Sequence, residues 1–582
     1  MTMKRPLVFY SVSLYLGCLF VLLFLDSILA AALVAAFFLI ILFFTLEIKA
    51  FTINVLFFLL GIFSFCIYFN VSIQNPVEIR IVDSKNYYFI GDFKGRKIIL
   101  EGKTKGLEEG QKITKVYGRF QKNFDIENGF IGNYYLTGYE YCKKDLVYYS
   151  YKFKKNLYEK FKNIIGKDRA ALIMALCYGE TNYINQDQMK NFQELGIIHA
   201  VSVSGFHMAL IYEVLEFTVG LKMAVFVSLF YVFFTGMAAA TMRSFIMILI
   251  FKLSSVFFKE YDSISSLSLA ALILIAFKPY YIVNIGFDLS FLATLGILLY
   301  SKAICRKLYK LPEKLAVSVS LTLSSQIFSL PYIAFTIQNF SYGFILGNLF
   351  LIPLFSIIIV LGNGALCLYP VEILFKYICT IINFIFTVID GGSIIALKLC
   401  PGVMYLKYED GLMAIALFTA IVMYKKGYEK FRHIPAACVI LMILRGYSFF
   451  TGISFINTDN GEAALIKRGF NKVMICNYNY LDASWIWKVK MQQSVDKIIT
   501  NPHENFVYNL GNGSYLKVNE NSKAHMEVTL NSKNKKFKFL LNKNVKDNKL
   551  AFDGEKAVFI PKMDIKDSSS YVIMFNMLFK LR

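Results

Sequence analysis

Two histidines and two serines stand close together at the start of a hydrophobic segment. The segment 196–208 carries them with an intervening glycine: His199, Ser202, Ser204, Gly205 and His207. Polar side chains are costly inside a bilayer, so such a group at membrane depth is a candidate functional site. On a continuous helix the two histidines would lie about 80° apart, too far round to share one metal ion. A break at Ser204-Gly205 would change this geometry, because irregular backbone is tolerated where it lines a cavity.

The same cluster is open to two alternative roles. Serine and histidine side chains also form hydrogen bonds between membrane helices with no further role. A hydrolase with a serine nucleophile and a histidine base is the second alternative, but the segment has no G-x-S-x-G turn and no acid beside the pair. We predict that the cluster lines a partly hydrated path, with interhelical hydrogen bonding as the alternative.

Further polar residues interrupt the later hydrophobic segments. Arg243 and Asp288 carry opposite charges at plausible membrane depth. They would allow an ion pair, with either a purely structural role or a role in the path. The predicted path residues of these segments are Arg243, Asp288, Ser290, Gln326 and Asn348.

The elements that must hold these residues are membrane helices. The chain has 582 residues, of which 56% are hydrophobic, and a mean hydropathy of +0.51. In a soluble domain this composition would leave too much apolar surface exposed. At roughly 20 apolar residues per span, candidate helices fall near 7–25, 28–46 and 51–69, with about ten more between 197 and 450. The predicted fold class is a polytopic α-helical membrane protein with about 11 to 13 transmembrane helices.

Two polar, lysine-rich stretches form the predicted soluble domains. Residues 75–169 and 451–582 each have 20 Lys and Arg against 12 Asp and Glu, a net charge of +8. This charge suits either ordinary solubility or a surface that faces a polyanion. Short β-rich runs between glycine turns over 77–150 predict a small OB-like barrel, a fold that carries single-stranded nucleic acid or is purely structural. Residues 152–169 predict an amphipathic helix on the membrane surface.

The placement of basic residues predicts the orientation of the chain. Lys4 and Arg5 precede the first helix, and the loops 301–314 and 425–432 are rich in lysine and arginine. The positive-inside rule therefore puts the N-terminus in the cytoplasm and both soluble domains outside the cell.

The cysteines predict no metal site. The 10 cysteines form no C-x-x-C pair and have no zinc-like spacing. Cys142 and Cys177 precede the main helical region on the same predicted face. They would form a disulfide if that face is oxidising.

Five motifs follow one another in a characteristic order. They are Ala175-Leu176-Cys177-Tyr178-Gly179 and the runs 196–207, 235–243, 284–294 and 348–353. This ordered set resembles the ComEC family of bacterial competence proteins. The run 129–138 is similar to the end of that family's extracellular OB-like domain, so the resemblance covers most of residues 1–450. It implies a channel that passes one strand of incoming DNA across the cell membrane.

The resemblance continues into residues 451–582. Residues 454–466 are similar to the opening of the family's metallo-β-lactamase-like domain, and 498–505 fall where its His-x-His-x-Asp-His cluster begins. Only His503 of that cluster is present, and His525 stands alone. Asn457, Asn477 and the scattered Asp459, Asp482 and Asp496 do not complete it. A two-metal hydrolase needs several His and carboxylate ligands, so we expect a degenerate domain that is not an enzyme and holds no cofactor.

The predicted organisation has five parts. They are N-terminal transmembrane helices (1–74), an extracellular OB-like domain (75–151), an amphipathic helix (152–169), a competence-type channel domain (170–450) and a degenerate metallo-β-lactamase-like domain (451–582). The expected function is import of single-stranded DNA across the bacterial cell membrane during natural transformation. The alternatives are a solute or ion transporter with the same intramembrane motifs, or a non-catalytic assembly protein of the uptake machinery.

Several partners are expected for such a channel. They are single-stranded DNA, the lipid bilayer, an extracellular DNA receptor, a separate nuclease, a cytoplasmic ATPase or helicase, and proteins that bind single-stranded DNA. Because the chain has no Walker A motif, active uptake is expected to be driven by a separate cytoplasmic ATPase or by ion gradients.

Overall fold

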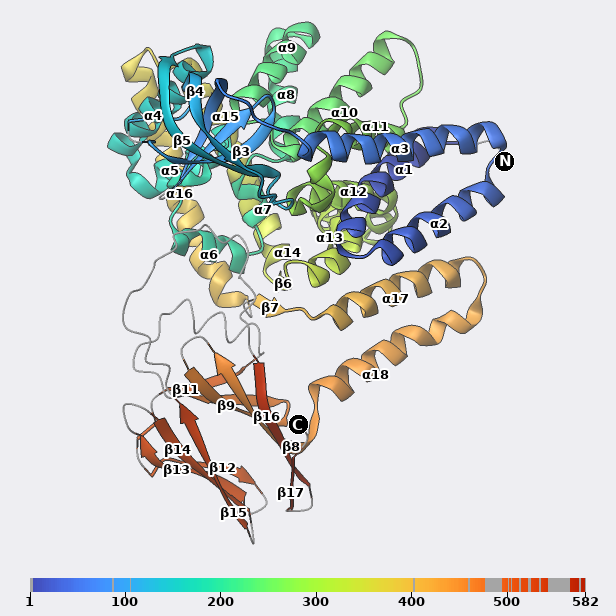
Figure 1. Ribbon diagram of the computed structural model, residues 1–582, viewed down its shortest axis with the longest axis vertical. Helices are drawn as coiled ribbons and strands as arrows, with labels where there is room; N and C mark the ends of the chain where they lie inside the picture. The colour runs from blue at the N-terminus through green and yellow to red at the C-terminus, as the bar shows by residue number, and fades with distance from the viewer. Residues whose placement is uncertain are drawn as a thin grey trace. The chain divides into compact units, whose positions relative to one another are not determined.

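Figure 1 presents a computed structural model of the chain. It describes residues 4–580 except 86–87, 105, 401–402, 459–460, 477–494, 501, 504, 512–513, 522–524, 533–534, 543–565 and 575–576. The chain divides into two compact units. One comprises 1–329 and 342–402, and the other comprises 330–341 and 403–582.

The first unit begins with three apolar helices. They are α1 (Pro6–Asp26), α2 (Ile28–Thr45) and α3 (Ile48–Phe69). Small residues let α1 and α3 approach closely, since a Cβ on Gly17 would lie 2.0 Å from the Phe58 carbonyl oxygen. The buried Ser13 hydroxyl bonds Asn54 across the same interface at 2.8 Å. All three helices are long and apolar enough to span a membrane, as the sequence predicted for the three N-terminal helices.

A closed five-stranded barrel follows α3. Its strands are β1 (Val77–Ser84), β2 (Phe89–Phe93), β3 (Arg96–Gly102), β4 (Lys112–Gln121) and β5 (Phe130–Lys143). Their order around the barrel is β1-β2-β3-β5-β4, with β3 and β5 parallel. Side chains alternate between the two faces of each strand, so Ile79, Ile81, Ile98 and Leu100 fill the interior and are fully buried. The predicted barrel is confirmed, and its order is consistent with an OB-like fold.

Helix α4 (Leu146–Ile165) begins before residue 152, the predicted start of the amphipathic helix. It also ends before residue 169, the predicted end. After Gly166 the chain continues as α5 (Lys167–Tyr178). Asp145 caps α4 by accepting a hydrogen bond from the Tyr148 backbone. The apolar face of α4, including Leu157 and Phe161, is buried in the main hydrophobic core of the unit. The helix is therefore amphipathic as predicted, but its apolar face packs on protein and does not lie on a membrane surface.

The remaining elements of the first unit are mostly helices. They are η1 (Thr181–Tyr183), α6 (Gln186–Glu194), α7 (Ile198–Val201), α8 (Gly205–Val219), α9 (Leu221–Phe234), α10 (Ala239–Val256), α11 (Ser263–Phe277), η2 (Pro279–Val283), α12 (Ile285–Lys307), α13 (Glu313–Phe335), α14 (Phe344–Leu346), the π-helical turn η3 (Gly347–Leu351), α15 (Ile352–Cys367) and α16 (Glu372–Leu399).

Eight helices within the described residues could cross a membrane by length and composition. They are α1, α2, α3, α10, α12, α13, the segment Phe344–Cys367 and α16. The shorter apolar helices α9 and α11 add to them. This number fits a polytopic membrane protein, and the total of about 11 to 13 spans stays a prediction.

The second unit combines a helical pair with β-sheets. It contains β6 (Asn339–Ser341), β7 (Val403–Tyr405), α17 (Tyr408–Lys425), η4 (Glu429–His433) and α18 (Ile434–Gly446). Ten strands follow: β8 (Ser448–Thr458), β9 (Gly461–Gly469), β10 (Asn471–Cys476), β11 (Lys497–Thr500), β12 (Val507–Gly511), β13 (Ser514–Asn521), β14 (His525–Ser532), β15 (Lys535–Asn542), β16 (Lys566–Met574) and β17 (Met577–Lys580).

These ten strands form two sheets that share a core. One has the order β11-β10-β9-β8-β16-β17 and the other β12-β13-β14-β15. Ile453 and Ile466 of the first sheet belong to one buried cluster with Leu516 and Val528 of the second. From the sequence an α/β or a β-rich form is expected for the C-terminal region, and its described part is β-rich. Strand β11 runs parallel to β10, and His503 follows it.

Candidate functional site

The chain breaks at Ser204-Gly205, the possibility raised from the sequence, and helix α8 starts there. Ser204 Oγ lies 2.7 Å from His207 Nδ1, and the Ser204 backbone N–H donates to the same nitrogen at 3.2 Å. With the Ser204 side chain also accepting from the His207 backbone N–H, the two residues form a capping box in which histidine replaces the usual Glu or Gln. Because Nδ1 accepts the backbone hydrogen bond, the neutral ring carries its proton on Nε2.

The His207 side chain leaves one buried polar atom unsatisfied. It is 1% exposed, and its Nε2 has no hydrogen-bond partner among the described residues. A buried N–H without a partner costs about 1–3 kcal/mol. A water molecule or a ligand is the natural partner for such a group.

Arg243, in the first half of α10, lies against the first residue of α8. A Cβ on Gly205 would come within 2.3 Å of an Arg243 terminal nitrogen, so only glycine leaves room for the guanidinium here. The guanidinium donates from Nε to Ser290 at 3.1 Å, from one terminal nitrogen to Ser244 at 3.1 Å and from the other to Thr294. The side chain is 8% exposed. The site therefore joins α8, α10 and α12 through one cation.

In the described part of the chain, Arg243 is held by hydroxyl groups, and the ion pair with Asp288 that the charges would allow is not among its contacts. The hydrogen bonds of Arg243 go to hydroxyl groups, with the Met247 sulfur 3.9 Å away. Asp288 is buried in the first turn of α12, a position where the helix dipole stabilises a carboxylate. Ser290, two residues later on the helix, points to the arginine instead.

Five of the predicted path residues thus gather around one place: Ser204, Gly205, His207, Arg243 and Ser290. Sequence reasoning missed Ser244 and Thr294 as partners of Arg243. Thr294 lies four residues after Ser290, on the same face of a helix, and that spacing was a usable signal. No such sequence signal indicated that Ser244 would bond Arg243, because neighbouring residues on a helix usually point apart.

His199 lies in the short helix α7, and Ser202 follows it in the irregular link before α8. Both side chains are exposed, in contrast to the buried His207. The backbone beside them is tightly packed, since a Cβ on Gly347 would lie 2.4 Å from the Leu195 carbonyl oxygen. The broken segment and the π-helical turn η3 therefore lie against each other. Such π-turns frequently occur at functional sites.

Two amides extend the set of unsatisfied polar groups. Asn348, within η3, and Gln326, within α13, each have a buried side-chain oxygen without a hydrogen-bond partner in the described part of the chain. Helix α13 contacts α12 where Gly296 meets the Ser324 carbonyl oxygen, 2.3 Å from the position of a Cβ. The predicted path residues are thus distributed over several packed helices, with Arg243 and Asp288 as the ionisable members.

A row of aromatic rings links the Arg243 site to the barrel. The guanidinium lies 5.9 Å from the Phe291 ring, Phe291 lies 4.3 Å from Phe287, and Phe287 lies 5.5 Å from Tyr281. Tyr281 contacts Tyr280 at 5.0 Å. Tyr280 in turn packs against the turn before β5, where a Cβ on Gly129 would meet its ring at 2.7 Å.

Two basic residues of the barrel, Arg96 and Lys97, lie where the barrel meets the helices. Arg96 donates to the carbonyl oxygens of Ile67 and Tyr68 at the end of α3, at 3.1 and 3.0 Å. A cation at a helix C-terminus is favourable for the helix dipole. Lys97 lies 5.4 Å from the Tyr280 ring, and its burial lowers the pKa of its ammonium group. The β2–β3 face, which binds oligonucleotides in many OB-like barrels, is therefore partly used for contact with the helices.

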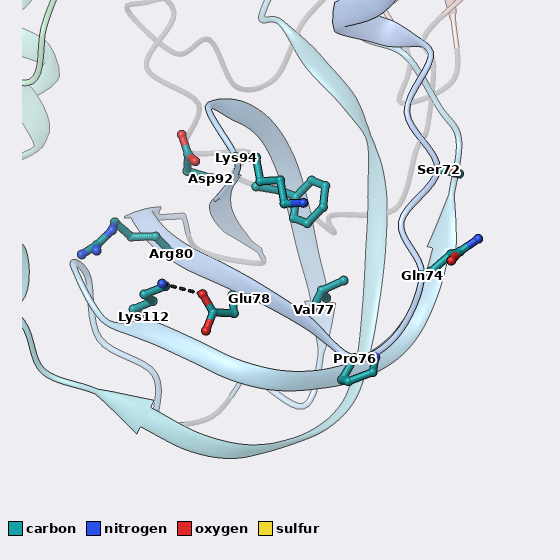
Figure 2. A pocket seen from close by; sticks show the side chains of 10 residues that line it. Ser72, Gln74, Pro76, Val77, Glu78, Arg80, Asp92, Lys94 and Lys112 are labelled. Atoms are coloured by element: carbon teal, nitrogen blue, oxygen red, sulfur yellow. Dashed lines mark ion pairs between the residues drawn. The ribbon is translucent and has the colours of Figure 1, made fainter.

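Figure 2 shows a hollow of about 740 Å³ on the barrel. It is lined by Ser72, Gln74, Pro76, Val77, Glu78, Arg80, Asp92, Phe93, Lys94 and Lys112. Lys112 pairs with Glu78, and Arg80 pairs with Asp145. The hydrogen bond from Arg80 lowers the pKa of Asp145 to about 2. These pairs neutralise most of the charge at the hollow, which gives it little preference for a polyanion.

The disulfide predicted between Cys142 and Cys177 is wrong. Both residues are free thiols. Cys142 is exposed on the barrel, where its sulfur lies 3.0 Å from the Gln111 side chain. Cys177 is fully buried in α5 against α15, with its sulfur 2.5 Å from the position of a Cβ on Gly362. Helix packing holds the second thiol inside the bundle, away from any oxidising surface.

The described part of the C-terminal sheets contains no group of side chains arranged to bind a metal ion. Within its described residues, no set of three or more His, Cys, Asp or Glu side chains is arranged to hold a metal ion. His503 is exposed. Asn477, Asp459 and Asp482 lie outside the described residues, as does the His525 side chain.

One family of known proteins matches the central, mostly helical part of the chain. Residues 176–424 match the Competence family, described as competence protein. ComE operon protein 3 of Bacillus subtilis (strain 168) is 25% identical over 271 residues, covering 44% of this chain and 34% of that protein. The match thus spans about a third of that relative's length. No solved structure matches the chain. The central part of the chain is therefore similar to competence proteins, in agreement with the order of its motifs.

Proposed function

We propose that this chain passes single-stranded DNA across the bacterial cell membrane during natural transformation. The proposal is supported mainly by the position of Arg243 and the groups around it. Arg243 is a buried arginine in a membrane-spanning helix, held by three hydroxyl groups rather than by a carboxylate. An ionisable residue in such a place is costly and marks a substrate or ion pathway.

The surroundings of Arg243 favour a phosphate group. Its charge is not neutralised by the hydroxyl partners, and it lies at the N-terminal end of α8. Helix N-termini attract anions through their free N–H groups and the helix dipole. The unsatisfied His207 Nε2 adds a hydrogen-bond donor near the same turn. A DNA strand presents phosphates one after another, and this site would contact them in turn without reading the bases.

The test is a transformation assay in a competent host that lacks its own copy of the protein and is complemented with variants. Arg243→Ala should abolish entry of DNA into the cytoplasm while DNA binding at the cell surface and membrane insertion of the protein stay intact. Lys252→Gln is the matched control, because Lys252 is on the same helix and pairs with Glu216 at 2.7 Å outside the site. Normal uptake with Arg243→Ala would contradict the proposal and favour a non-catalytic assembly role.

The proposal also includes the orientation of the chain in the membrane. A cytoplasmic N-terminus and external placement of the barrel and the C-terminal sheets are supported by the charge of the loops 301–314 and 425–432. In this arrangement an external receptor and a nuclease deliver one strand, and a cytoplasmic ATPase or helicase and single-strand-binding proteins collect it. Labelling of Cys142 in intact cells by a membrane-impermeant maleimide tests the external placement of the barrel.

We further propose that the C-terminal sheets do not hydrolyse DNA. The proposal is supported by the scarcity of histidine in residues 451–582, which contain only His503 and His525. Metal-dependent hydrolysis needs clustered ligands and an open coordination position for water. The strand that stays outside would then be degraded by a separate protein.

A further inference from the structure

In the described part of the chain, the buried Arg243 guanidinium has one N–H group without an acceptor. A guanidinium carries five N–H groups. Three of them donate to hydroxyl oxygens, and a fourth faces the Met247 sulfur at 3.9 Å. The fifth belongs to the terminal nitrogen that also bonds Ser244. The partner of a buried N–H group that the chain does not supply is water or a ligand.

Further unused donors lie around the same nitrogen. The terminal nitrogen and the Ser244 hydroxyl are both beside Gly205, 2.3 and 2.4 Å from the position of a Cβ. Within the described residues, the Ser244 hydroxyl only accepts from Arg243, so its proton is free for another acceptor. The backbone N–H groups of Gly205 and Phe206 begin α8 and have no intrahelical acceptor. We call Gly205, Phe206, Arg243 and Ser244 the donor turn.

No carboxylate among the described residues contacts the donor turn, so its positive charge is not neutralised there. Asp288 precedes Ser290 by two residues on α12, and positions two apart on a helix do not face the same way. Glu216 of α8 is paired with Lys252 at 2.7 Å. Glu213 lies about 12 Å along α8 from its first residue. A buried charge without a counter-ion is costly, and a mobile anion would supply the counter-ion.

The donor turn is accessible from the start of α8. Phe206, in the first turn, is 45% exposed, and Ser202 before it is exposed as well. The free N–H groups of a first turn point away from the helix towards any ion at its N-terminus. This exposure leaves a way for a small ion to reach the donors.

We propose that the donor turn binds a small inorganic anion, chloride or inorganic phosphate, when no DNA strand occupies the path. Its free groups are all hydrogen-bond donors, a set that suits an anion and offers no ligand to a metal cation. The anion compensates the charge of Arg243 in the resting protein. A phosphate of the DNA then replaces it. This replacement rests on the proposed function, whereas binding of the inorganic anion does not.

The test uses the purified full-length protein in a non-ionic detergent, with potassium gluconate as the background salt. Binding of radiolabelled chloride and of radiolabelled phosphate is measured separately by equilibrium dialysis, and thermal unfolding is followed in the same solutions. At least one of the two ions should bind at a saturable site and raise the unfolding midpoint, and the ion that binds identifies the occupant. Arg243→Gln, which keeps a polar side chain without the charge, should lose this site.

A second variant keeps the charge and removes one donor. Ser244→Ala should bind the ion at least about ten-fold more weakly, because a hydrogen bond to a charged group contributes that much or more. Ser254→Ala is its control, since the Ser254 hydroxyl of the same helix bonds the Phe251 carbonyl oxygen at 2.7 Å. Lys252→Gln is the control for Arg243→Gln. Both controls should bind the ion like the native protein and unfold near its midpoint.

Two outcomes would overturn the proposal. One is the absence of saturable binding of either ion by the native protein. The other is native-like binding by Ser244→Ala or by folded Arg243→Gln.

A thymidine oligonucleotide separates this proposal from the proposed function. It should release the bound ion from the native protein. An ion that binds as expected but is not released would support the anion site and contradict passage of DNA past Arg243. Loss of transformation in Arg243→Ala without any anion site in the native protein would do the reverse.

Discussion

Substitution of Gly205 by alanine tests whether the position of the Arg243 guanidinium matters for uptake. The added Cβ would lie 2.3 Å from an Arg243 terminal nitrogen and 2.4 Å from Ser244 Oγ. Both atoms end short or flexible side chains, whereas no helix backbone is among the close contacts. The least costly relaxation is a shift of the guanidinium, so the protein should fold and the arginine should leave its hydroxyl partners.

The expected cost follows from those contacts. Overpacking of a filled site costs about 1–3 kcal/mol, and a hydrogen bond from a charged donor contributes about 1.5–3 kcal/mol. If one such bond is lost and others re-form, Gly205→Ala should lower the free energy of unfolding by about 1–3 kcal/mol. Uptake should fall far more, towards the level of Arg243→Ala, because the cation is no longer held at the N-terminal end of α8.

Gly391→Ala is the matched control. Gly391 lies inside α16, and a Cβ there meets nothing within 4 Å. Alanine in a helix interior is more stable than glycine by roughly 0.5–1 kcal/mol, so this variant should be at least as stable as the native protein and take up DNA normally. Transformation frequency and thermal unfolding in detergent measure both effects. A stable, fully active Gly205→Ala variant would refute the reasoning about Arg243.

Three other outcomes are expected. The hydrogen bond from Arg80 holds the pKa of Asp145 at about 2 in the folded protein, whereas its pKa in the unfolded chain is about 4. The stability that Asp145 contributes is therefore fully present above about pH 4 and is lost as the pH falls towards about 2. Thermal unfolding of the full chain across that range should depend less on pH in Asp145→Asn, and equal dependence would contradict this. Peptide mapping after maleimide labelling of the folded protein should find Cys142 modified and Cys177 protected, whereas a disulfide-linked peptide would show the structure wrong on this point. The purified protein with Mn²⁺ or Zn²⁺ should leave DNA uncut. Divalent-dependent cleavage that His503→Ala abolishes would contradict this and show that the C-terminal region is a nuclease.

Features that depend on local periodicity were predictable from the sequence. The three N-terminal spans follow from the lengths of uninterrupted apolar runs, because the bilayer sets the length of a helix that crosses it. The barrel follows from short alternating runs, since a period of two puts every second residue inside. The break at Ser204-Gly205 was also predictable, because serine is a preferred cap and the helix can begin after it.

Features that depend on which helices become neighbours were not predictable. Arg243 and Asp288 have the right charges for a pair, but α10 and α12 pack with Ser290 and Thr294 facing the arginine. The predicted Cys142–Cys177 disulfide failed for the same kind of reason, since α5 is buried against α15.

The sequence by itself determined that this protein has membrane-spanning helices and a barrel, and it identified a short list of polar residues that are expensive in lipid. Only the tertiary structure decided that Gly205 makes room for Arg243, that His207 caps α8, and that the Ser244 hydroxyl lies beside the same glycine. The physical reason is the range of the interactions. Hydrophobic period and length act along the chain, whereas hydrogen bonds and close contacts act between segments that only packing brings together.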